Sequence, residues 1–550
     1  MTDMPLQGMV GHGIAGNSGA PLGVVLEISG SGSLVAFDPQ RLAECASDAD
    51  PAIAMSGQVG SQIRIRVGST WLLASVRNQK QGRRGDEGIL AAIDFLGEGS
   101  ANRLTGEINT FRRGVTNYPM PGAMVYPAST RDLVAVYAGD GRNAIEIGRV
   151  HPTRDIRASL YIDQFLGKHF ALLGSTGTGK STSLALILHR ICEAAPQGHI
   201  LMIDPHGEYA SAFRETGLIL DVSNLQLPYW MMNFEEHCEI LLSSHGDNRQ
   251  IDAEILGRCL LQARQKSRLS ESLGGRITVD SPVPYLLSDF QAILQSEMGK
   301  LDKATTSAPF TRIRGRLDEL KADPRYNFLF SGMLVGDTMV EVLGRMFRLP
   351  ARGQPISIMD VSGVPSEITS TVVAMMSRLV FDFAIWAREE KTRPLLLVCE
   401  EAHRYVPNEK NAEGSSVGRI LSRIAKEGRK YGVSLGLITQ RPSDLAEGVL
   451  SQCGTIIAMR LNNERDQAFV RAAMPEGARG FLDSIPALRN RECIICGEGV
   501  SIPMRVAFDD LEEHKRPASS DPSFSELWSE AGDELEMVQR TVQRWRTQGR

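Results

Sequence analysis

Short apolar and alternating runs fill the chain up to about residue 150. They include LGVVLEI, SLVAF, IRIRVG, TWLLASV and AIEIGRV, and turn-forming stretches such as SGSG and GRRGDEG separate them. A helical period of 3.6 residues is not evident there. Short strands at this spacing predict a small β-barrel or sandwich. We therefore expect residues 1–150 to form a β-rich N-terminal domain.

From about residue 168 the pattern changes to longer apolar runs separated by helical stretches. The strand candidates are HFALLG (169–174), HILMID (199–204), PISIMD (355–360), LLLVC (395–399), VSLGLITQ (433–440) and TIIAMR (455–460). Continuous apolar runs are typical of a parallel sheet that is covered on both faces. Between residues 230 and 350 the spacing is helical instead. The pattern predicts an α/β core in two parts, 151–229 and 351–510, with a helical insertion at 230–350. Residues 511–550 read as a polar linker and one helix.

Composition and charge narrow the classes of protein. The run TVVAMMSRLVFDFAIW is interrupted by Arg378 and Asp382, and the N-terminus has no signal-like run, so we expect a cytoplasmic protein without a membrane span. A net charge of −5 excludes a globally basic nucleic-acid coat but leaves room for a local basic surface. Eight scattered cysteines suit reduced thiols. Cys493 and Cys496 have zinc-like spacing without a second pair nearby, which favours an apolar strand.

One segment predicts a nucleotide site. Residues 174–181 match G-x-x-x-x-G-K-[ST], directly after a strand candidate and before a helical run. Backbone N–H groups of such a loop converge on phosphates, while Lys180 reaches the β- and γ-phosphates and Ser181 holds Mg²⁺. The expected ATP-binding residues are Gly174, Ser175, Thr176, Gly177, Thr178, Gly179, Lys180, Ser181 and Thr182.

Two strands end in acids that are suited to the metal side of this site. HILMID ends at Asp204, and LLLVC runs into Glu400 and Glu401. Only the second strand has adjacent acids, so we predict that Glu400 contacts Mg²⁺ through a water molecule and that Glu401 is the general base for the attacking water. The alternative for the glutamate pair is an acidic helix start. Asp204 fits a metal-side or supporting acid and a strand-end Asp-Pro turn equally well.

Two further candidates follow the glutamates. Gln440 ends a strand candidate, where it suits a γ-phosphate sensor or a polar turn residue. Arg429 follows Gly428 and is our candidate for an arginine finger that acts on a neighbouring subunit's nucleotide. Arg419, Arg423, Lys426 and Lys430 are spaced to share one helix face. This face reads either as a solvated surface or as a surface that contacts DNA phosphates.

Together these segments resemble the HerA family within the FtsK/HerA group of P-loop DNA translocases. The resemblance rests on LLGSTGTGKST, IDPHGEY, LPYWMMNFEE, CEEAHRYVP, EGRKYGVSLGLITQRPSDL and LSQCGTIIAMRLNNERD, after a β-rich N-terminal region. It implies an N-terminal HAS barrel, a RecA-like ATPase core with a helical insertion, and a ring of six subunits that moves on double-stranded DNA using ATP and Mg²⁺.

The resemblance also implies residue roles and partners. It supports Lys180 and Ser181 on phosphate and metal, Glu401 as catalytic acid, Gln440 as sensor and Arg429 as the finger acting in trans. Asp204 and Glu208 match a family signature of supporting or metal-side character, and Lys168 stands where some members have an arginine that contacts the nucleotide. Family members work with a separate nuclease or effector protein, of the NurA type or sirtuin-like, in DNA end processing or antiphage defence.

Two alternative functions stay open at this point. One is an ATP-regulated ring scaffold that assembles and activates an effector enzyme without long-range translocation. A small-molecule P-loop kinase would need a mobile acceptor lid, and no segment indicates one.

Overall fold

The fold is described from a computed structural model of the chain. It describes residues 19–82, 88–102, 105–137, 143–151, 153, 155–243, 249–274, 276–299, 307–331, 335–408, 415–474, 478–518, 524–529, 532 and 534–547. These residues form two compact units. The first unit contains the described residues up to Ser183, with Gln440–Ser443 and Cys453–Asp510. The second contains those within Leu184–Thr439, Asp444–Gln452 and from Leu511 onward.

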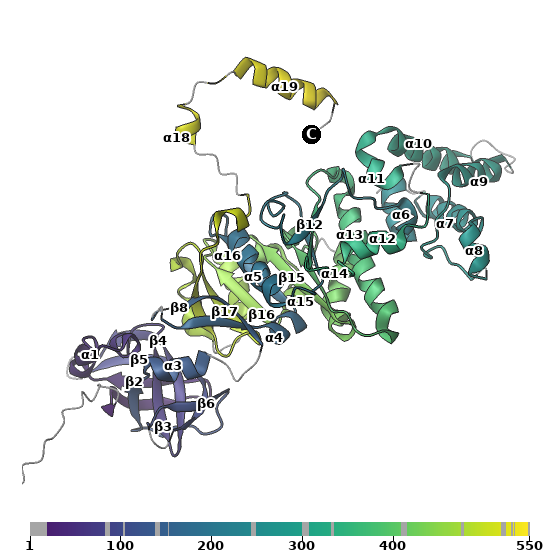
Figure 1. Cartoon of the computed structure of the whole chain (residues 1–550). Coiled ribbons are helices and arrows are strands. Elements are labelled where there is room, and N and C mark those ends of the chain that lie inside the picture. The colour runs from purple at the N-terminus through teal and green to yellow at the C-terminus, as the bar shows by residue number, and fades with distance from the viewer. Residues whose placement is uncertain are drawn as a thin grey trace, which may run out of the picture. The chain divides into compact units, whose positions relative to one another are not determined.

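The first unit begins with a closed β-barrel (Figure 1). Its strands are β1 (Gly23–Ile28), β2 (Gly32–Phe37), β3 (Gln62–Val67), β4 (Thr70–Gln81), β5 (Ile89–Ala101) and β7 (Met124–Pro127), with β6 (Ile108–Arg113) added outside the ring. The barrel closes because the first half of β5 pairs with β2, while its second half pairs with β6. Inward-facing residues such as Val35, Ile63, Ile65 and Ile93 form its core. Short helices α1 (Pro39–Cys45), α2 (Pro51–Ala54) and α3 (Thr130–Tyr137) accompany the strands.

The rest of the first unit contains part of a mixed sheet. Its strand order is β10-β16-β17-β18-β8-β9, comprising β10 (Phe170–Leu173), β16 (Thr455–Met459), β17 (Glu492–Gly497), β18 (Met504–Phe508), β8 (Ala144–Val150) and β9 (Arg157–Tyr161). Strands β10 and β16 are parallel and the other neighbours antiparallel. The run AIEIGRV was expected among the N-terminal barrel strands, and that assignment is wrong. It forms β8, which finds its hydrogen-bond partners in β18 and β9.

The second unit contains five parallel strands in the order β12-β13-β11-β14-β15. They are β12 (Gly217–Leu220), β13 (Ile356–Asp360), β11 (Ile200–Asp204), β14 (Leu395–Cys399) and β15 (Val433–Thr439). Every residue of β11, β14 and β15 is buried, as their apolar runs predict. The long helix α13 (Ser366–Trp386) packs on β14, β15 and α14 (Ser416–Glu427). The strand β12 was not predicted, because GLIL is too short to stand out.

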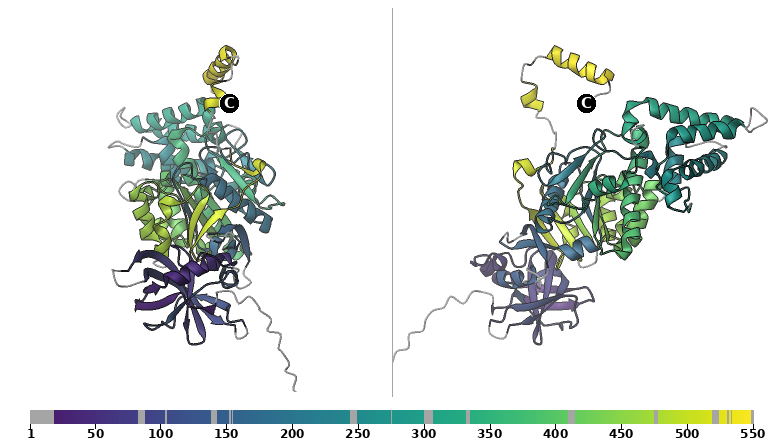
Figure 2. Two further views of the ribbon diagram at one scale, coloured as in Figure 1. Left: turned by 90° about the vertical axis from the view of Figure 1, so that its left-hand side faces the viewer. Right: turned by 45° about the vertical axis from the view of Figure 1, so that its right-hand side comes forward.

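The expected helical insertion is present between β12 and β13 (Figures 1 and 2). Its helices are α6 (Phe234–Leu241), α7 (Arg249–Gln265), α8 (Arg268–Ser272), α9 (Leu287–Gly299), α10 (Ala308–Ala322), α11 (Asn327–Phe330) and α12 (Met339–Met346). Helices α7, α9 and α10 pack together. The fold class is therefore confirmed: a P-loop α/β core with a helical insertion follows a small β-barrel. The residue limits of the domains stay predictions.

The remaining helices lie outside the insertion. They are α4 (Ile162–Gly167), α5 (Lys180–Ala194), α15 (Glu447–Leu450), α16 (Glu464–Ala473), α17 (Arg479–Leu482), α18 (Phe524–Leu527) and α19 (Glu534–Thr547). The single C-terminal helix predicted from the sequence is therefore two helices. Gly532 lies between them and is not helical. Glycine disfavours helix because its backbone loses the most freedom on ordering.

By length and hydropathy, one helical segment of the described residues passes as a membrane span. It covers Ser366–Glu389, and 67% of its most apolar window is buried inside the protein. Its polar interruptions are paired: Arg378 donates to Glu236 at 2.8 and 3.0 Å and to Asp382 at 2.9 Å. The segment thus packs as a core helix of the second unit.

The eight cysteines are free thiols, and all except Cys453 are buried. Cys493 and Cys496 lie within β17 as small apolar residues, as the sequence predicted.

Candidate functional site: a P-loop and a carboxylate loop

The phosphate loop connects β10 to α5 in the first unit. Gly177 and Gly179 have φ of +74° and +91°, a region that favours glycine. Gly174 lies so close to β16 that a Cβ there would come within 2.8 Å of the Cβ of Met459. The glycines thus let the loop turn tightly and direct its N–H groups inward, the arrangement that binds phosphate.

The loop is fixed by neighbouring backbone. The N–H of Ser175 donates to the carbonyl of Arg460 at 2.9 Å, and that of Arg491 donates to the carbonyl of Thr178 at 2.9 Å. Lys180 Nζ donates to the Ser175 carbonyl at 3.1 Å, so the lysine lies back across its own loop. Ser181 and Thr182 follow in the first turn of α5 and are partly exposed.

Gln440 contacts the phosphate loop. Its Oε1 accepts a hydrogen bond from the hydroxyl of Thr176, and both residues belong to the first unit. A side-chain amide bonded to a P-loop hydroxyl is well placed to respond to phosphate there. The sensor role remains a prediction. Lys168, also in the first unit, forms an ion pair with Glu498.

Asp204, in the second unit, organises the loop that follows β11. Its carboxylate accepts from the backbone N–H groups of His206 (3.2 Å), Gly207 (2.9 Å) and Tyr209 (2.9 Å). Burial raises the pKa of Asp204, while these hydrogen bonds oppose the rise. Three backbone bonds to one carboxylate are what a strand-end turn requires. Glu208, partly exposed, presents its carbonyl to the N–H of Ala518 at 2.9 Å.

The same loop reaches Glu400. The backbone N–H of Tyr209 donates to Asp204, and the Tyr209 hydroxyl donates to Glu400 Oε2 at 3.1 Å. The N–H of Glu400 donates to the Ile203 carbonyl at 3.2 Å, so the end of β14 is tied to β11. Glu400 is thus a buried carboxylate with an oriented oxygen.

Glu401 differs from Glu400 in its backbone and in its hydrogen bonding. Its φ of +52° and ψ of +43° lie in the left-handed region, which is uncommon outside glycine. It is 7% exposed, and its Oε2 has no hydrogen-bond partner among the described residues. Nδ1 of His403 lies 3.2 Å from this oxygen, a contact that is an ion pair only when the histidine is protonated. A buried carboxylate oxygen without a partner is costly, which indicates a place reserved for water or another ligand.

Arg429 lies in the 3₁₀ helix η7 (Gly428–Tyr431), directly after α14. It is exposed, and its guanidinium makes no ion pair among the residues that the structure describes. Lys430 lies in η7 too. The prediction that Lys430 shares a helix face with Arg419, Arg423 and Lys426 is therefore wrong, because α14 ends at Glu427.

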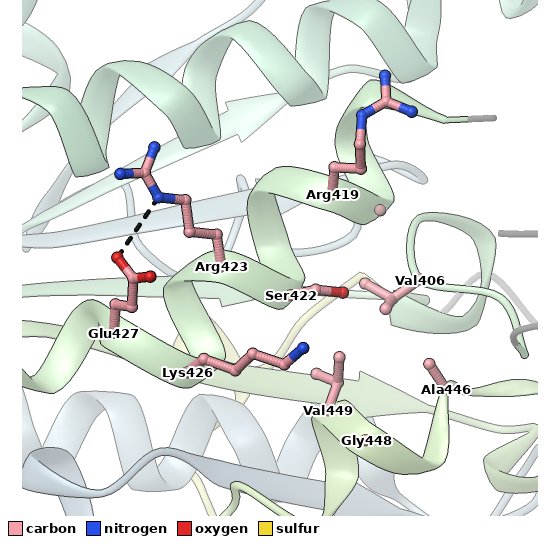
Figure 3. A pocket seen from close by; sticks show the side chains of 10 residues that line it. Val406, Arg419, Ser422, Arg423, Lys426, Glu427, Ala446, Gly448 and Val449 are labelled. Carbon is pink, nitrogen blue, oxygen red and sulfur yellow. Dashed lines mark hydrogen bonds and ion pairs between the residues drawn. The ribbon is translucent and has the colours of Figure 1, made fainter. Parts of the chain in front are cut away.

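The remaining basic side chains of α14 line a cavity of about 410 Å³ against Val406 and α15 (Figure 3). Arg419 pairs with Glu235, and Arg423 pairs with Glu427 at 3.4 Å while lying over the ring of Phe381. The Lys426 side chain extends toward Val449. The two arginines have acidic partners, whereas no ion pair of Lys426 is found in the described part of the chain.

The donor set suits Mg²⁺ that is bound mainly by phosphate oxygens. The predicted donors are the Ser181 hydroxyl of the first unit and the Glu400 carboxylate of the second. Mg²⁺ in nucleotide sites takes one or two groups of these kinds with several waters and phosphates, and their binding of one ion stays a prediction. Among the described residues there is no group of three or more His, Cys, Asp and Glu side chains placed to hold a metal.

Sequence reasoning missed three contributors: Tyr209 and His403 in the second unit, and Arg491 in the first. Tyr209 and His403 were within quoted motifs, IDPHGEY and CEEAHRY, but their partners are set by the fold. The signal for Arg491 is weaker still, since it acts through its backbone N–H and a φ of +61°.

Comparison with known proteins tests the resemblance. The family described as "Helicase HerA, central domain" matches residues 145–380. The resemblance to the HerA family is confirmed. The chain is accordingly a P-loop ATPase that is similar to HerA helicases, as expected from its phosphate loop.

Curated HerA relatives cover most of the chain. A DNA double-strand break repair helicase HerA of Pyrococcus furiosus is 25% identical over 503 residues, which are 82% of this chain and 85% of the relative. The protein of the same name from Sulfolobus acidocaldarius is 26% identical over 436 residues, 78% of this chain and 80% of the relative.

Solved structures also align with this chain. VirB4 of Thermoanaerobacter pseudethanolicus matches with a TM-score of 0.47 and 16% identity, over 68% of this chain and 98% of that one. The bacterial conjugative coupling protein TrwB matches with a TM-score of 0.46 and 15% identity, over 71% of this chain and 94% of that one.

Proposed function

We propose that this HerA-type ATPase is a translocase of double-stranded DNA that works as a hexameric ring. Two features support the proposal. Its HerA relatives are named as DNA double-strand break repair helicases and match it over most of their length. The chain also keeps an intact phosphate loop and a pair of acids at the end of β14.

Within this proposal each site residue has a task. The P-loop N–H groups and Lys180 bind the ATP phosphates, and Ser181 and Glu400 hold Mg²⁺, Glu400 through a water molecule. The metal, when bound, neutralises developing phosphate charge. Glu401 accepts the proton of the attacking water, and Gln440 senses the γ-phosphate. Asp204 supports Glu400 through Tyr209, in keeping with the three backbone bonds and the hydroxyl described above.

One observation carries the assignment of Glu401 as the base: its Oε2 is buried and makes no hydrogen bond to any residue that the structure describes. A glutamate that served only to cap a helix would use its oxygens on backbone N–H groups, and Glu401 makes no such bond. A general base needs a free oxygen within reach of water.

The test is ATP hydrolysis by the purified full chain with and without duplex DNA. We expect stimulation by duplex DNA in wild type and loss of activity in Lys180→Ala. Equal rates with and without DNA, together with no salt-sensitive DNA binding, would contradict translocation.

We further propose that the cavity on α14 contacts the DNA backbone, with Lys426 as a direct phosphate ligand. Lys426→Ala should weaken duplex binding at every sequence and reduce the slope of log K against log[salt] by about 0.9, one phosphate contact. Lys391→Ala removes an equal charge from an exposed loop and is the matched control. An unchanged slope in Lys426→Ala would place the DNA elsewhere.

A separate nuclease or effector protein is part of the proposal, because the HAS-barrel translocases that this chain resembles act with one. Co-purification from the native host identifies it. An effector that stays fully active with a Glu401→Gln ring would favour the scaffold function over the motor, since the ring would then bind ATP without hydrolysing it.

A further inference from the structure

His403 lies between Glu401 and the end of β15. It belongs to the 3₁₀ helix η6 (Ala402–Arg404), which begins directly after Glu401. Its Nδ1 is 3.0 Å from the hydroxyl oxygen of Thr439 and 3.2 Å from Glu401 Oε2. The Thr439 side chain is completely buried, and those of His403 and Glu401 are nearly so. All three residues belong to the second unit.

A ring nitrogen of histidine offers one in-plane position, which holds either a proton or a lone pair. Nδ1 therefore makes one good hydrogen bond at a time. The Thr439 hydroxyl occupies that position, since it meets hydrogen-bond geometry while Glu401 Oε2 does not. Thr439 and Glu401 thus compete for a hydrogen bond with Nδ1 of His403, and Thr439 is the residue that makes it.

From this geometry we infer that Thr439 is a positioning residue for ATP hydrolysis: by occupying Nδ1 of His403, it keeps Oε2 of Glu401 unbonded and available to the attacking water. This inference rests on the proposed role of Glu401 as general base. Without the Thr439 hydroxyl, Nδ1–H turns to the carboxylate 3.2 Å away. Oε2 of Glu401 then accepts a hydrogen bond from the imidazole and binds the attacking water less well.

The same contact links the base to the sensor along the chain. Thr439 immediately precedes Gln440, whose side chain accepts from Thr176 of the phosphate loop.

Thr439→Val keeps the side-chain volume but removes the hydroxyl. We expect kcat for ATP to fall by about 10-fold, less than the 10²–10⁴ that a general base contributes in full, with KM unchanged. Thr439→Ser restores the hydroxyl and should restore kcat. Adding His403→Phe to Thr439→Val removes Nδ1, the competing donor, and should return kcat to the level of His403→Phe alone.

Ser434→Ala is the matched control, because Ser434 lies in the same strand and its buried hydroxyl has no hydrogen-bond partner in the described part of the chain. It should behave as wild type. Equal defects in Thr439→Ser and Thr439→Val, or multiplicative losses in the double variant, would overturn the inference. If Glu401→Gln itself retains turnover, the proposed base is wrong. If Glu401→Gln is inactive and Thr439→Val is normal, only the positioning role is wrong.

Discussion

Two features of Glu401 reduce the stability of the fold: its backbone conformation and its buried carboxylate oxygen. A non-glycine residue in the left-handed region costs on the order of 1–3 kcal/mol. A buried carboxylate oxygen without a partner adds a desolvation penalty of similar size. Stability would favour another residue or another rotamer here. Function explains the combination better, since strain of this kind is retained where side-chain placement serves chemistry.

Glu401→Gln should abolish ATP turnover while sparing ATP binding, because glutamine keeps the shape of the side chain but cannot accept a proton from water. Glu400→Asp should be mild, because a water-bridged metal contact tolerates one methylene less. Single-turnover hydrolysis and nucleotide binding, measured separately, check both. Equal loss of turnover in the two variants would mean that the roles are assigned wrongly.

Sequence reasoning could find these glutamates but not their neighbours. Adjacent acids after an apolar run are a local pattern, and so is the phosphate loop. The bond from Tyr209 to Glu400 joins residues 191 positions apart, and that from His403 to Thr439 spans 36. Such contacts depend on which strands become neighbours, and strand order does not follow from the pattern of any single strand.

At the scale of elements, the helical insertion depends on a buried histidine. His237, in α6, contacts the Asn233 carbonyl at 2.7 Å and the Tyr285 hydroxyl at 3.0 Å. Burial, and then the nearby Arg264, lower the pKa of His237 to about 3. The residue is therefore neutral in the folded protein over the whole physiological range.

The stability of the insertion should consequently fall on acidification. Above about pH 6.5 His237 is neutral in both states, whereas between about 6.5 and 3 only the unfolded chain binds the proton. The free energy of unfolding then decreases by about 1.4 kcal/mol per pH unit from this group. Urea unfolding at pH 7 and pH 5 should show a smaller loss in His237→Gln than in wild type.

His514→Gln, at an exposed position, should keep the wild-type loss between these pH values. If His237→Gln also shows the full wild-type loss of stability between pH 7 and pH 5, another group governs the acid sensitivity.

Strand limits were predicted best where both faces of a strand are buried, because such a strand is a continuous apolar run. The strands β10, β11, β13, β14, β15 and β16 all lie at or within one residue of their predicted ends. The errors concern β8, whose alternation fits either sheet, and the C-terminal helix, which the pattern continued across Gly532. At both places the local sequence pattern is compatible with two structures, and contacts with other parts of the chain determine which of them forms.

For the whole molecule, the position of Arg429 favours function between subunits. Its guanidinium is exposed and has no acidic partner among the described residues, so it is available to a neighbouring chain. Arg429→Ala should abolish hydrolysis without affecting ATP binding, because a finger stabilises charge in the transition state.

Mixed rings test donation between subunits. Lys180→Ala subunits cannot bind ATP but keep Arg429, whereas Arg429→Ala subunits bind ATP but lack the finger. Rings that contain both should recover part of the activity. Arg429→Ala mixed with the double variant Lys180→Ala/Arg429→Ala is the control and should recover none. No recovery in the first mixture, with subunit exchange verified, would exclude donation in trans.

The buried thiols have a practical consequence for watching such a ring at work. Burial raises the pKa of Cys192, Cys399 and Cys496 to about 12, so almost none of these groups is thiolate at neutral pH. Maleimide dyes react with the thiolate. A single cysteine introduced at an exposed position, such as Trp386→Cys, should therefore be labelled selectively in the native sequence background. Fluorescence from one dye per subunit would then count the subunits of a ring and follow its movement on DNA.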